Sequence, residues 1–471
     1  MKLAGRRHRH ASCLDDAGPL KSRKLQCSGK GFPEMPFALN AIYSAVLVLF
    51  SPVLFYRWFR AGKYREGWSE KFRGKAPLRI GDNPCLWFHA VSVGEVLLLR
   101  PLVSEMARRR PKWQVVISTT TTTGLAVARR TFPELVTFYA PLDFSWATRR
   151  AVRQIRPTVL ALVELELWPN LIRAAKRDGA QVAIINARLS SRSYRGYRSL
   201  RAPLQRTLGR IDVVAAQNGE YARRFVELGI PGNRISVTGS VKYDGLESDR
   251  NNGKTRELRQ LLGLAPSDLV FVAGSTMEGE EAAVLAAYRA ARRQHSSLRL
   301  VLVPRHAERF DGVAQWLEQQ GEVVARRSVV TTPIPRGAGG TRPIILIDTI
   351  GELAAVWGLA DVAFVGGSLR QGRGGQNMME PAAYGASVMF GPHVANFRDT
   401  VNQLLERKAA RQVADAEELT RGLLDDLDDP EAAAVRGAAG RSFVLAQNGA
   451  AGRTLAELDR LVESSLVKRN A

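Results

Sequence analysis

The chain has 471 residues, which is long enough for two or three domains. Its composition, with 45% hydrophobic and 24% charged residues, is that of a globular protein and argues against disorder in the body of the chain. Its formal net charge of +23 favours anionic partners, namely nucleic acid, acidic lipid surfaces or phosphorylated small molecules, and charge alone leans towards nucleic acid. Three cysteines without a CxxC pair and six scattered histidines argue against a disulfide framework and against a metal site.

The first segment of the chain, residues 1–34, has an excess of basic side chains and no hydrophobic periodicity. We expect this segment to be a disordered leader, since it has too little apolar surface to bury. Met35 opens the apolar run that follows directly. This position indicates that translation starts at Met35, in which case residues 1–34 are upstream sequence.

Residues 35–56 contain no charged side chain, and the run is just long enough for the roughly 20 apolar residues that a membrane-spanning helix needs. Polar side chains within the run leave a shallow interfacial helix open as one alternative, and a buried core helix, disfavoured by the basic residues that follow, is the other. Arg57, Arg60 and Lys63 follow at once, and by the positive-inside rule they place the rest of the chain in the cytoplasm. We therefore predict a membrane-anchor helix over residues 35–60, in the inner (cytoplasmic) membrane.

After about residue 80, short apolar runs alternate with amphipathic helical patterns, which predicts an α/β protein with parallel sheets covered on both faces. The first set of predicted strands comprises residues 85–90, 114–118, 158–163, 181–186 and 212–217. The second set comprises residues 269–274, 298–303, 344–348, 361–366 and 387–391. Each set is typical of a Rossmann-like domain, in which ligands bind beyond the carboxyl ends of the strands.

The polar stretch of residues 245–254 separates the two sets of strands and is predicted to be a linker. We therefore expect one Rossmann-like domain at residues 61–244 and a second at residues 255–440, with a cleft between them. Residues 441–471 are predicted to close the chain as a single amphipathic helix.

Two acidic motifs follow predicted strands of the first domain. Glu95 lies at a strand-to-helix turn, where a carboxylate aimed at the cleft could act as a general base or could simply stabilise the helix dipole. Glu164 and Glu166 alternate with apolar residues, so both side chains are expected on one side of an extended chain. This pattern indicates substrate contact, and a pair of solvated loop carboxylates is the alternative.

Cationic and small polar residues follow other predicted strands. Lys242, Arg305 and His306 have the charge that suits a phosphate group, although ordinary surface charge would explain them as well. Ser275 lies in a loop that enters a helix, where helix capping is a sufficient explanation. Only the small Gly-Ser pair at this point indicates close approach of a ligand.

The most informative stretch is the glycine-rich loop of residues 366–385, which follows a strand and opens a helix. Backbone N–H groups at Gly366, Gly367 and Ser368 are candidates to hold a phosphate. Asn377 and Glu380 lie three residues apart and hence on one helix face, and a carboxylate there suits a ribose. Because the sequence has no GxGxxG after the first strand and no GxxxxGK[ST], it does not favour hydride transfer with NAD or P-loop ATP hydrolysis.

The order and spacing of these motifs resemble those of a known family. The motifs are HAVSVGEV, ELELWPN, NARLS, VTGSVKYD, VPRHAERF, GGSL followed by GGQNMMEP, and GPHVANF. They resemble the 3-deoxy-D-manno-octulosonic acid (Kdo) transferases of lipopolysaccharide biosynthesis. The resemblance runs from about Pro36 to the C-terminus and leaves only the leader outside. One departure is Gln376, where members of the family often have a histidine.

The resemblance implies a GT-B fold, in which two Rossmann-like domains face a cleft, with a short membrane anchor at the start. It implies CMP-Kdo as donor substrate, a lipid A precursor as acceptor, and neither a metal nor a cofactor. It suggests Glu95 as the general base on the glucosamine 6-hydroxyl and gives weight to Glu166 of the ELELWPN motif. Contacts with the donor phosphate or carboxylate are implied for Lys242, Arg305 and His306, and contacts around the CMP ribose and phosphate for Asn377 and Glu380.

The sequence therefore predicts a metal-independent, inverting transferase that moves Kdo from CMP-Kdo to a lipid A precursor at the cytoplasmic face of the inner membrane. One alternative is another GT-B enzyme that uses a UDP-sugar on a lipid acceptor. The other is a membrane-tethered nucleic-acid-binding protein, which would need clustered basic and aromatic residues. Since the Lys and Arg residues are spread along the chain, we expect no nucleic acid and no obligate protein partner.

Overall fold

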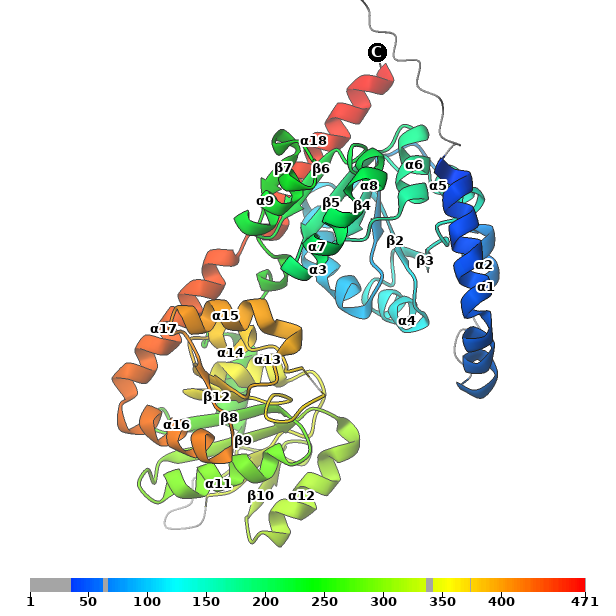
Figure 1. Ribbon diagram of the computed structural model, residues 1–471. Coiled ribbons are helices and arrows are strands. Elements are labelled where there is room, and N and C mark those ends of the chain that lie inside the picture. Colours follow the sequence, from blue (N-terminus) through cyan, green and yellow to red (C-terminus); the bar gives the residue numbers. More distant parts are fainter. Residues whose placement is uncertain (1–34, 62–66, 336–341, 373, 471) are drawn as a thin grey trace, which may run out of the picture.

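The computed structural model describes residues 35–61, 67–335, 342–372 and 374–470 (Figure 1). The leader predicted for residues 1–34 lies outside the described residues. The described chain forms two α/β domains joined at one side, each built on a seven-stranded parallel sheet (Figure 1). The fold class predicted from the alternation of apolar runs and helical patterns is therefore confirmed.

The N-terminal domain has the strand order β3-β2-β1-β4-β5-β6-β7. Its strands are β1 (Cys85–His89), β2 (Gln114–Thr119), β3 (Val136–Tyr139), β4 (Val159–Val163), β5 (Gln181–Ala187), β6 (Val213–Ala216) and β7 (Ile235–Val237). Its helices are α1 (Met35–Ala61), α2 (Trp68–Arg73), α3 (Val93–Arg109), α4 (Thr122–Thr131), α5 (Ser145–Ile155), α6 (Pro169–Arg177), α7 (Ser191–Ser199), α8 (Arg201–Leu208) and α9 (Gly219–Glu227).

The C-terminal domain has the strand order β10-β11-β9-β8-β12-β13-β14. Its strands are β8 (Leu269–Thr276), β9 (Leu298–Pro304), β10 (Val324–Arg326), β11 (Ile344–Leu346), β12 (Val362–Val365), β13 (Ser387–Phe390) and β14 (Arg411–Gln412). Its helices are α10 (Gly253–Leu261), α11 (Glu280–Arg292), α12 (Phe310–Gln319), α13 (Leu353–Val356), α14 (Met379–Ala383), α15 (Arg398–Glu406), α16 (Ala416–Asp428) and α17 (Pro430–Gln447), and α18 (Ala450–Asn470) follows.

Both faces of each sheet are buried, which explains why the central strands are apolar along their whole length. In β1, alternate side chains enter different cores: Leu86 and Phe88 pack with α3 on one face, and Cys85 and Trp87 pack with α5 and α6 on the other. The strands that the sequence did not predict are β3, β7, β10 and β14, the four edge strands of the two sheets. Edge strands are half exposed and so lack a continuous apolar run.

The C-terminal segment differs from its prediction, because two helices replace the expected single helix over residues 441–471. α17 packs on α14 and β13 of the C-terminal domain, whereas α18 returns to α3 and β5 of the N-terminal domain (Figure 1, red). The two helices are separated at Gly449, whose φ of 85° is readily adopted only by glycine. α10 begins at Gly253, inside the segment predicted to be a linker.

Both crossings between the domains meet at Asp244. This residue ends the N-terminal domain, and its carboxylate accepts hydrogen bonds from the N–H groups of Gly449 (2.7 Å), Ala450 (3.3 Å) and Ala451 at the start of α18. A carboxylate in this position satisfies N–H groups that the first turn of a helix leaves free, and it complements the positive end of the helix dipole. The outgoing linker therefore fixes the start of the returning helix.

Helix α1 spans Met35–Ala61 and lies against the N-terminal domain (Figure 1). Asn40 exchanges hydrogen bonds with Ser145 at the start of α5, and the Tyr43 hydroxyl donates to the Asp143 carboxylate at 3.0 Å. Many of its apolar side chains are exposed, among them Phe37 and Leu49. In the part of the chain that the structure describes, no helix combines the length and apolarity needed to cross a membrane.

Candidate functional site

Glu95 occupies the first turn of α3, directly after the carboxyl end of β1. Ser92 caps this helix: the N–H of Glu95 donates to Ser92 Oγ (3.3 Å), and the Ser92 hydroxyl donates to Glu95 Oε1 (2.8 Å). The N–H of Val91 donates to Glu95 Oε2 at 2.9 Å. The capping role considered for Glu95 is therefore real, and it fixes the carboxylate at the edge of the sheet that faces the other domain.

The electrostatic environment of Glu95 is unusual for a capping residue. Burial raises the pKa of its carboxyl to about 7, although the hydrogen bonds from Val91 and Ser92 act in the opposite direction. The nearby negative charges of Glu166 and Glu164 raise the pKa further. A carboxyl group that titrates near neutral pH at the end of a parallel strand has the properties of a general base.

The second acidic motif lies beside Glu95 but has a different geometry from the one predicted. Glu164 has a left-handed backbone with φ 59°, so the chain turns there and the expected extended segment with both carboxylates on one side is wrong. Glu166 Oε2 accepts a hydrogen bond from Trp168 Nε1 at 3.0 Å, and burial raises its pKa. Glu164 Oε1 pairs with Lys242 Nζ at 3.0 Å. The turn thus directs the Glu166 carboxylate to the indole of Trp168 and the Glu164 carboxylate to the ammonium group of Lys242.

A buried histidine packs against the tryptophan of this acidic cluster. His89 ends β1, its Nδ1 lies 3.0 Å from Ser118 Oγ, and its ring packs edge-on against Trp168, the partner of Glu166. Complete burial lowers the pKa of His89 to about 4, so the ring is neutral at physiological pH. His89 is the first residue of the HAVSVGEV motif, but nothing in the sequence pattern distinguishes it from the other residues of the buried strand.

A cavity of about 290 Å³ lies between the two domains, next to the start of α3. It is lined by Gly94, Arg188, Gln217, Asn218, Tyr221, Ser240, Lys242, Tyr243, Met379, Asn396, Phe397, Asp399, Thr400, Gln403 and Gln447. Asp399 of the C-terminal domain accepts a hydrogen bond from the Tyr221 hydroxyl (2.6 Å) and pairs with Arg188 (2.8 Å). Tyr243 and Thr400 form a further hydroxyl contact across the cavity at 3.2 Å.

Lys242 is the predicted site residue that lines this cavity, and sequence reasoning missed Arg188, Tyr221 and Asp399. Arg188 belongs to the NARLS motif, which resembles the family but does not by itself indicate a role for the arginine. An Arg after the buried strand β5 was the available signal. Tyr221 and Asp399 lie on helices α9 and α15 with no distinctive local pattern, so only their meeting in space identifies them.

On the C-terminal domain, several predicted residues come together at the ends of β9 and β12. Arg305 Nε donates to Gln376 Oε1 at 3.2 Å, and Asn377 Nδ2 donates to Glu380 Oε1 at 2.9 Å. Burial raises the pKa of Glu380, while the hydrogen bond from Asn377 and the charge of Arg305 oppose this shift. Gln376, which departs from the family pattern, thus keeps Arg305 in place through its amide oxygen.

Two predicted residues stand apart from that cluster. His306 is half-buried, and its Nδ1 lies 3.8 Å from Glu308 in the same loop. Ser275 is buried at the end of β8 with a left-handed backbone of φ 59°. A Cβ atom on Gly366 would lie 2.5 Å from the Ser275 carbonyl oxygen. Gly366 is therefore needed for the close approach of these two backbones. The Gly-Ser pair at residues 274–275, predicted to lie close to a ligand, lies close to this neighbouring loop instead.

The predicted phosphate cradle in the glycine-rich loop is wrong, because a carboxylate of the protein already occupies it. Glu280 Oε2 accepts the N–H of Gly367 (2.7 Å), and Glu280 Oε1 accepts those of Ser368 and Leu369 (both 2.9 Å). The Ser368 hydroxyl donates to the Val365 carbonyl and accepts from the N–H of Gly391. Gly366, Gly367 and Ser368 thus build the loop and have no N–H group directed at a ligand.

Comparison with known proteins identifies the family. Residues 66–245 match the model of the 3-deoxy-D-manno-octulosonic-acid transferase (kdotransferase) family. The chain is 33% identical to the 3-deoxy-D-manno-octulosonic acid transferase of Haemophilus influenzae over 410 residues, which cover 86% of this chain and 94% of that protein. It is also 33% identical to the transferase of the same name from Bordetella pertussis over 441 residues, which cover 89% of this chain and 99% of that protein.

In three dimensions the chain is similar to UDP-GlcNAc 2-epimerase from Neisseria meningitidis, solved with UDP-GlcNAc bound. The TM-score is 0.54 at 12% identity, with 80% of this chain and 100% of that chain covered. A likeness at this level of identity shows the shared two-domain fold alone. The family resemblance, the fold and the enzyme class predicted from the motifs are confirmed. The chain belongs to the Kdo transferase family, the glycosyltransferases that add Kdo in lipopolysaccharide biosynthesis.

Proposed function

We propose that this enzyme transfers Kdo from CMP-Kdo to the glucosamine 6-hydroxyl of a lipid A precursor, with Glu95 as the general base. The observation that carries the proposal is the Glu95 carboxyl, held at the carboxyl end of β1 with its pKa raised to about 7. A base with such a pKa is largely ionised at slightly alkaline pH and still basic enough to take a proton from a sugar hydroxyl in the transition state.

The reaction is a single displacement that inverts the ketosidic carbon of Kdo. The acceptor O6 forms a bond to this carbon while the bond to the CMP phosphate oxygen breaks, and the O6 proton passes to Glu95. An ionised carboxylate has about four lone-pair positions. The hydrogen bonds from Val91 and Ser92 use two of them, which leaves room for the acceptor hydroxyl.

The leaving CMP is assigned to the cluster on the C-terminal domain. Asn377 and Glu380 offer an amide and a carboxyl for ribose hydroxyls, and the Arg305 guanidinium offers a charge-assisted contact for phosphate or for the Kdo carboxylate. Because Glu280 occupies the N–H groups of Gly367, Ser368 and Leu369, we assign the stabilisation of the leaving phosphate to side chains of Arg305 and Lys242.

We also propose that the enzyme works on the cytoplasmic face of the inner membrane and is held there by α1. This proposal is supported by exposed apolar side chains on α1: Phe37, Val48 and Leu49 are 72%, 73% and 74% exposed. A helix with such a surface gains free energy when it lies in the interfacial region of a bilayer. The net charge of +23 adds attraction to anionic lipids. Function without a metal, a cofactor, nucleic acid or an obligate protein partner remains a prediction.

Mass spectrometry of the product tests the proposed reaction. Purified enzyme is incubated with a lipid A precursor and either CMP-Kdo or a UDP-sugar. We expect the lipid to gain the mass of Kdo with CMP-Kdo only. Transfer from the UDP-sugar, or no product with CMP-Kdo, would overturn the assignment of donor and acceptor.

A further inference from the structure

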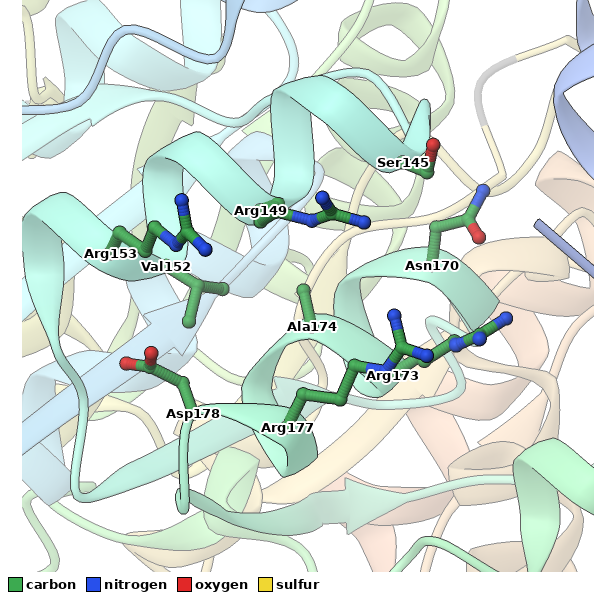
Figure 2. A pocket seen from close by; sticks show the side chains of 9 residues that line it. All are labelled: Ser145, Arg149, Val152, Arg153, Asn170, Arg173, Ala174, Arg177 and Asp178. Carbon is green, nitrogen blue, oxygen red and sulfur yellow. The ribbon is translucent and has the colours of Figure 1, made fainter. Parts of the chain in front are cut away.

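We propose that the pocket between α5 and α6 binds the phosphate group of an anionic membrane phospholipid. The proposal rests on the membrane attachment through α1 suggested above. The pocket has a volume of about 290 Å³. Four arginines line it, together with Ser145 and Asn170 (Figure 2). None of these residues belongs to the proposed catalytic or donor-binding clusters.

The four arginines are arranged in pairs on two neighbouring helices. Arg149 and Arg153 are the fifth and ninth residues of α5, and Arg173 and Arg177 are the fifth and ninth residues of α6. Residues four apart share one face of a helix. Figure 2 shows one pair on each helix, with the pocket between them. The two helices thus bring four guanidinium groups around one hollow.

Three of these four arginines lack an ion-pair partner within the described part of the chain. Arg149, Arg153 and Arg177 form no ion pair with any residue in the described ranges, and Asp178 is the single acid among the lining residues. Like charges four residues apart destabilise a helix, so the arrangement has a cost to folding. The positive potential extends to Arg210, whose pKa is lowered by burial and by the charges of Arg173, Arg177 and Arg206.

An Arg cluster of this kind fits a phosphate, since guanidinium groups donate paired hydrogen bonds to phosphate oxygens. The position of the pocket selects a lipid as the source. Its wall residues Ser145 and Asn170 contact Asn40 of α1, with Ser145 Oγ accepting from Asn40 Nδ2 at 2.8 Å. A phospholipid whose chains lie beside the exposed apolar side chains of α1 would present its phosphate to this pocket.

Vesicle binding by two charge-matched variants tests the proposal. The pocket variant is Arg149→Gln, Arg153→Gln and Arg177→Gln. The control variant is Arg129→Gln, Arg130→Gln and Arg150→Gln, which removes the same charge from exposed positions of α4 and α5 outside the pocket. Co-sedimentation is measured with phosphatidylcholine vesicles that contain phosphatidylglycerol. We expect the pocket variant to bind on the order of tenfold more weakly than the control, because it loses direct contacts as well as long-range attraction.

The alternatives give different results. Equal losses in the two variants, both folded by circular dichroism, would mean general attraction and would overturn the proposal. If the pocket variant loses binding of inorganic phosphate in calorimetry but keeps vesicle binding, the site takes free phosphate, and the lipid assignment fails. An increased KM for the detergent-dispersed acceptor, in the pocket variant alone and with unchanged vesicle binding, would assign the site to the acceptor instead.

The proposed reaction is tested separately by the same proteins. If the wild-type enzyme transfers Kdo to a detergent-dispersed acceptor but does not bind the vesicles, the membrane attachment and the phosphate pocket both fail while the reaction stands. If it binds vesicles through the pocket but transfers no Kdo, the proposed reaction fails and the pocket stands.

Discussion

At the scale of single residues, Glu95 combines two roles that the sequence presented as alternatives. Its hydrogen bonds with Ser92 and Val91 are those of a capping residue, and its raised pKa is that of a general base. The first role fixes the carboxylate in position, and burial beside Glu164 and Glu166 supplies the second. A motif can reveal a carboxylate at a strand end, but its pKa depends on neighbours that are distant in sequence.

Replacement of Glu95 by glutamine keeps the size of the side chain and one acceptor oxygen but removes the base. We expect kcat for Kdo transfer to fall by about 10²–10⁴-fold, the usual contribution of general-base catalysis, with CMP binding unchanged. Steady-state kinetics and calorimetric titration with CMP measure the two effects. Glu105→Gln on the same helix serves as the control, since the ion pairs of Glu105 with described residues are those with Arg108 and Arg109. Wild-type turnover in Glu95→Gln would remove Glu95 from the mechanism.

The pH dependence follows from the same carboxyl. The base must be ionised to accept a proton, so kcat/KM should fall as pH decreases through about 7, where Glu95 becomes protonated. Glu166→Gln removes a negative charge that raises the pKa of Glu95, and should move this acidic limb to lower pH. Rate profiles of both proteins provide the measurement. A limb that stays in place in Glu166→Gln would show that the two carboxylates are not coupled.

At the scale of elements, predictability depended on burial. Each strand buried on both faces was found from its apolar run, whereas the edge strands β3, β7, β10 and β14 were missed because half of each is exposed. The glycine-rich loop was found, but its function was not. Its glycines suggested a phosphate cradle, and no local pattern could reveal that Glu280, from a distant helix, occupies the N–H groups.

The loop itself offers a stability test. In Glu280→Ala the N–H groups of Gly367, Ser368 and Leu369 lose a buried acceptor. Unpaired buried donors cost about 1–3 kcal/mol each, so the free energy of unfolding should fall by at least about 3 kcal/mol. Urea denaturation measures the change. Glu278→Ala, at an exposed position beside α11, is the control and should be close to neutral. An equally small effect in both variants would contradict the role of Glu280.

At the scale of the whole molecule, the two domains are joined by two crossings and by contacts across the cavity. The sequence predicted the first crossing from its polar composition. It did not predict the second, because α17 and α18 have a nearly continuous helical pattern, which Asn448 and Gly449 interrupt. Likewise, the contacts of Asp399 with Arg188 and Tyr221 join residues about two hundred positions apart, a relation that local sequence patterns do not contain.

Asp244 is the residue through which the two crossings can be tested. Asp244→Ala removes the acceptor for the first N–H groups of α18. Loss of such a cap costs about 0.5–2 kcal/mol, which should lower Tm by a few degrees. Differential scanning calorimetry gives the shift, and limited proteolysis should cut first near residues 448–449. Asp249→Ala, which removes a carboxylate from the linker without touching α18, should leave both measurements unchanged. Faster cleavage elsewhere would show that the crossing does not depend on Asp244.

The return of α18 has a consequence for biosynthesis. Leu455, Leu458 and Val462 of this helix belong to the same core as Leu86 and Phe88 of β1, at the opposite end of the domain's sequence. Since a chain leaves the ribosome from its N-terminus, the part of this apolar face that α18 covers stays exposed while the second domain is synthesised. A nascent or prematurely terminated chain therefore exposes the surface that chaperones and proteases recognise. The last helix thus makes completion of the first domain dependent on completion of the whole polypeptide.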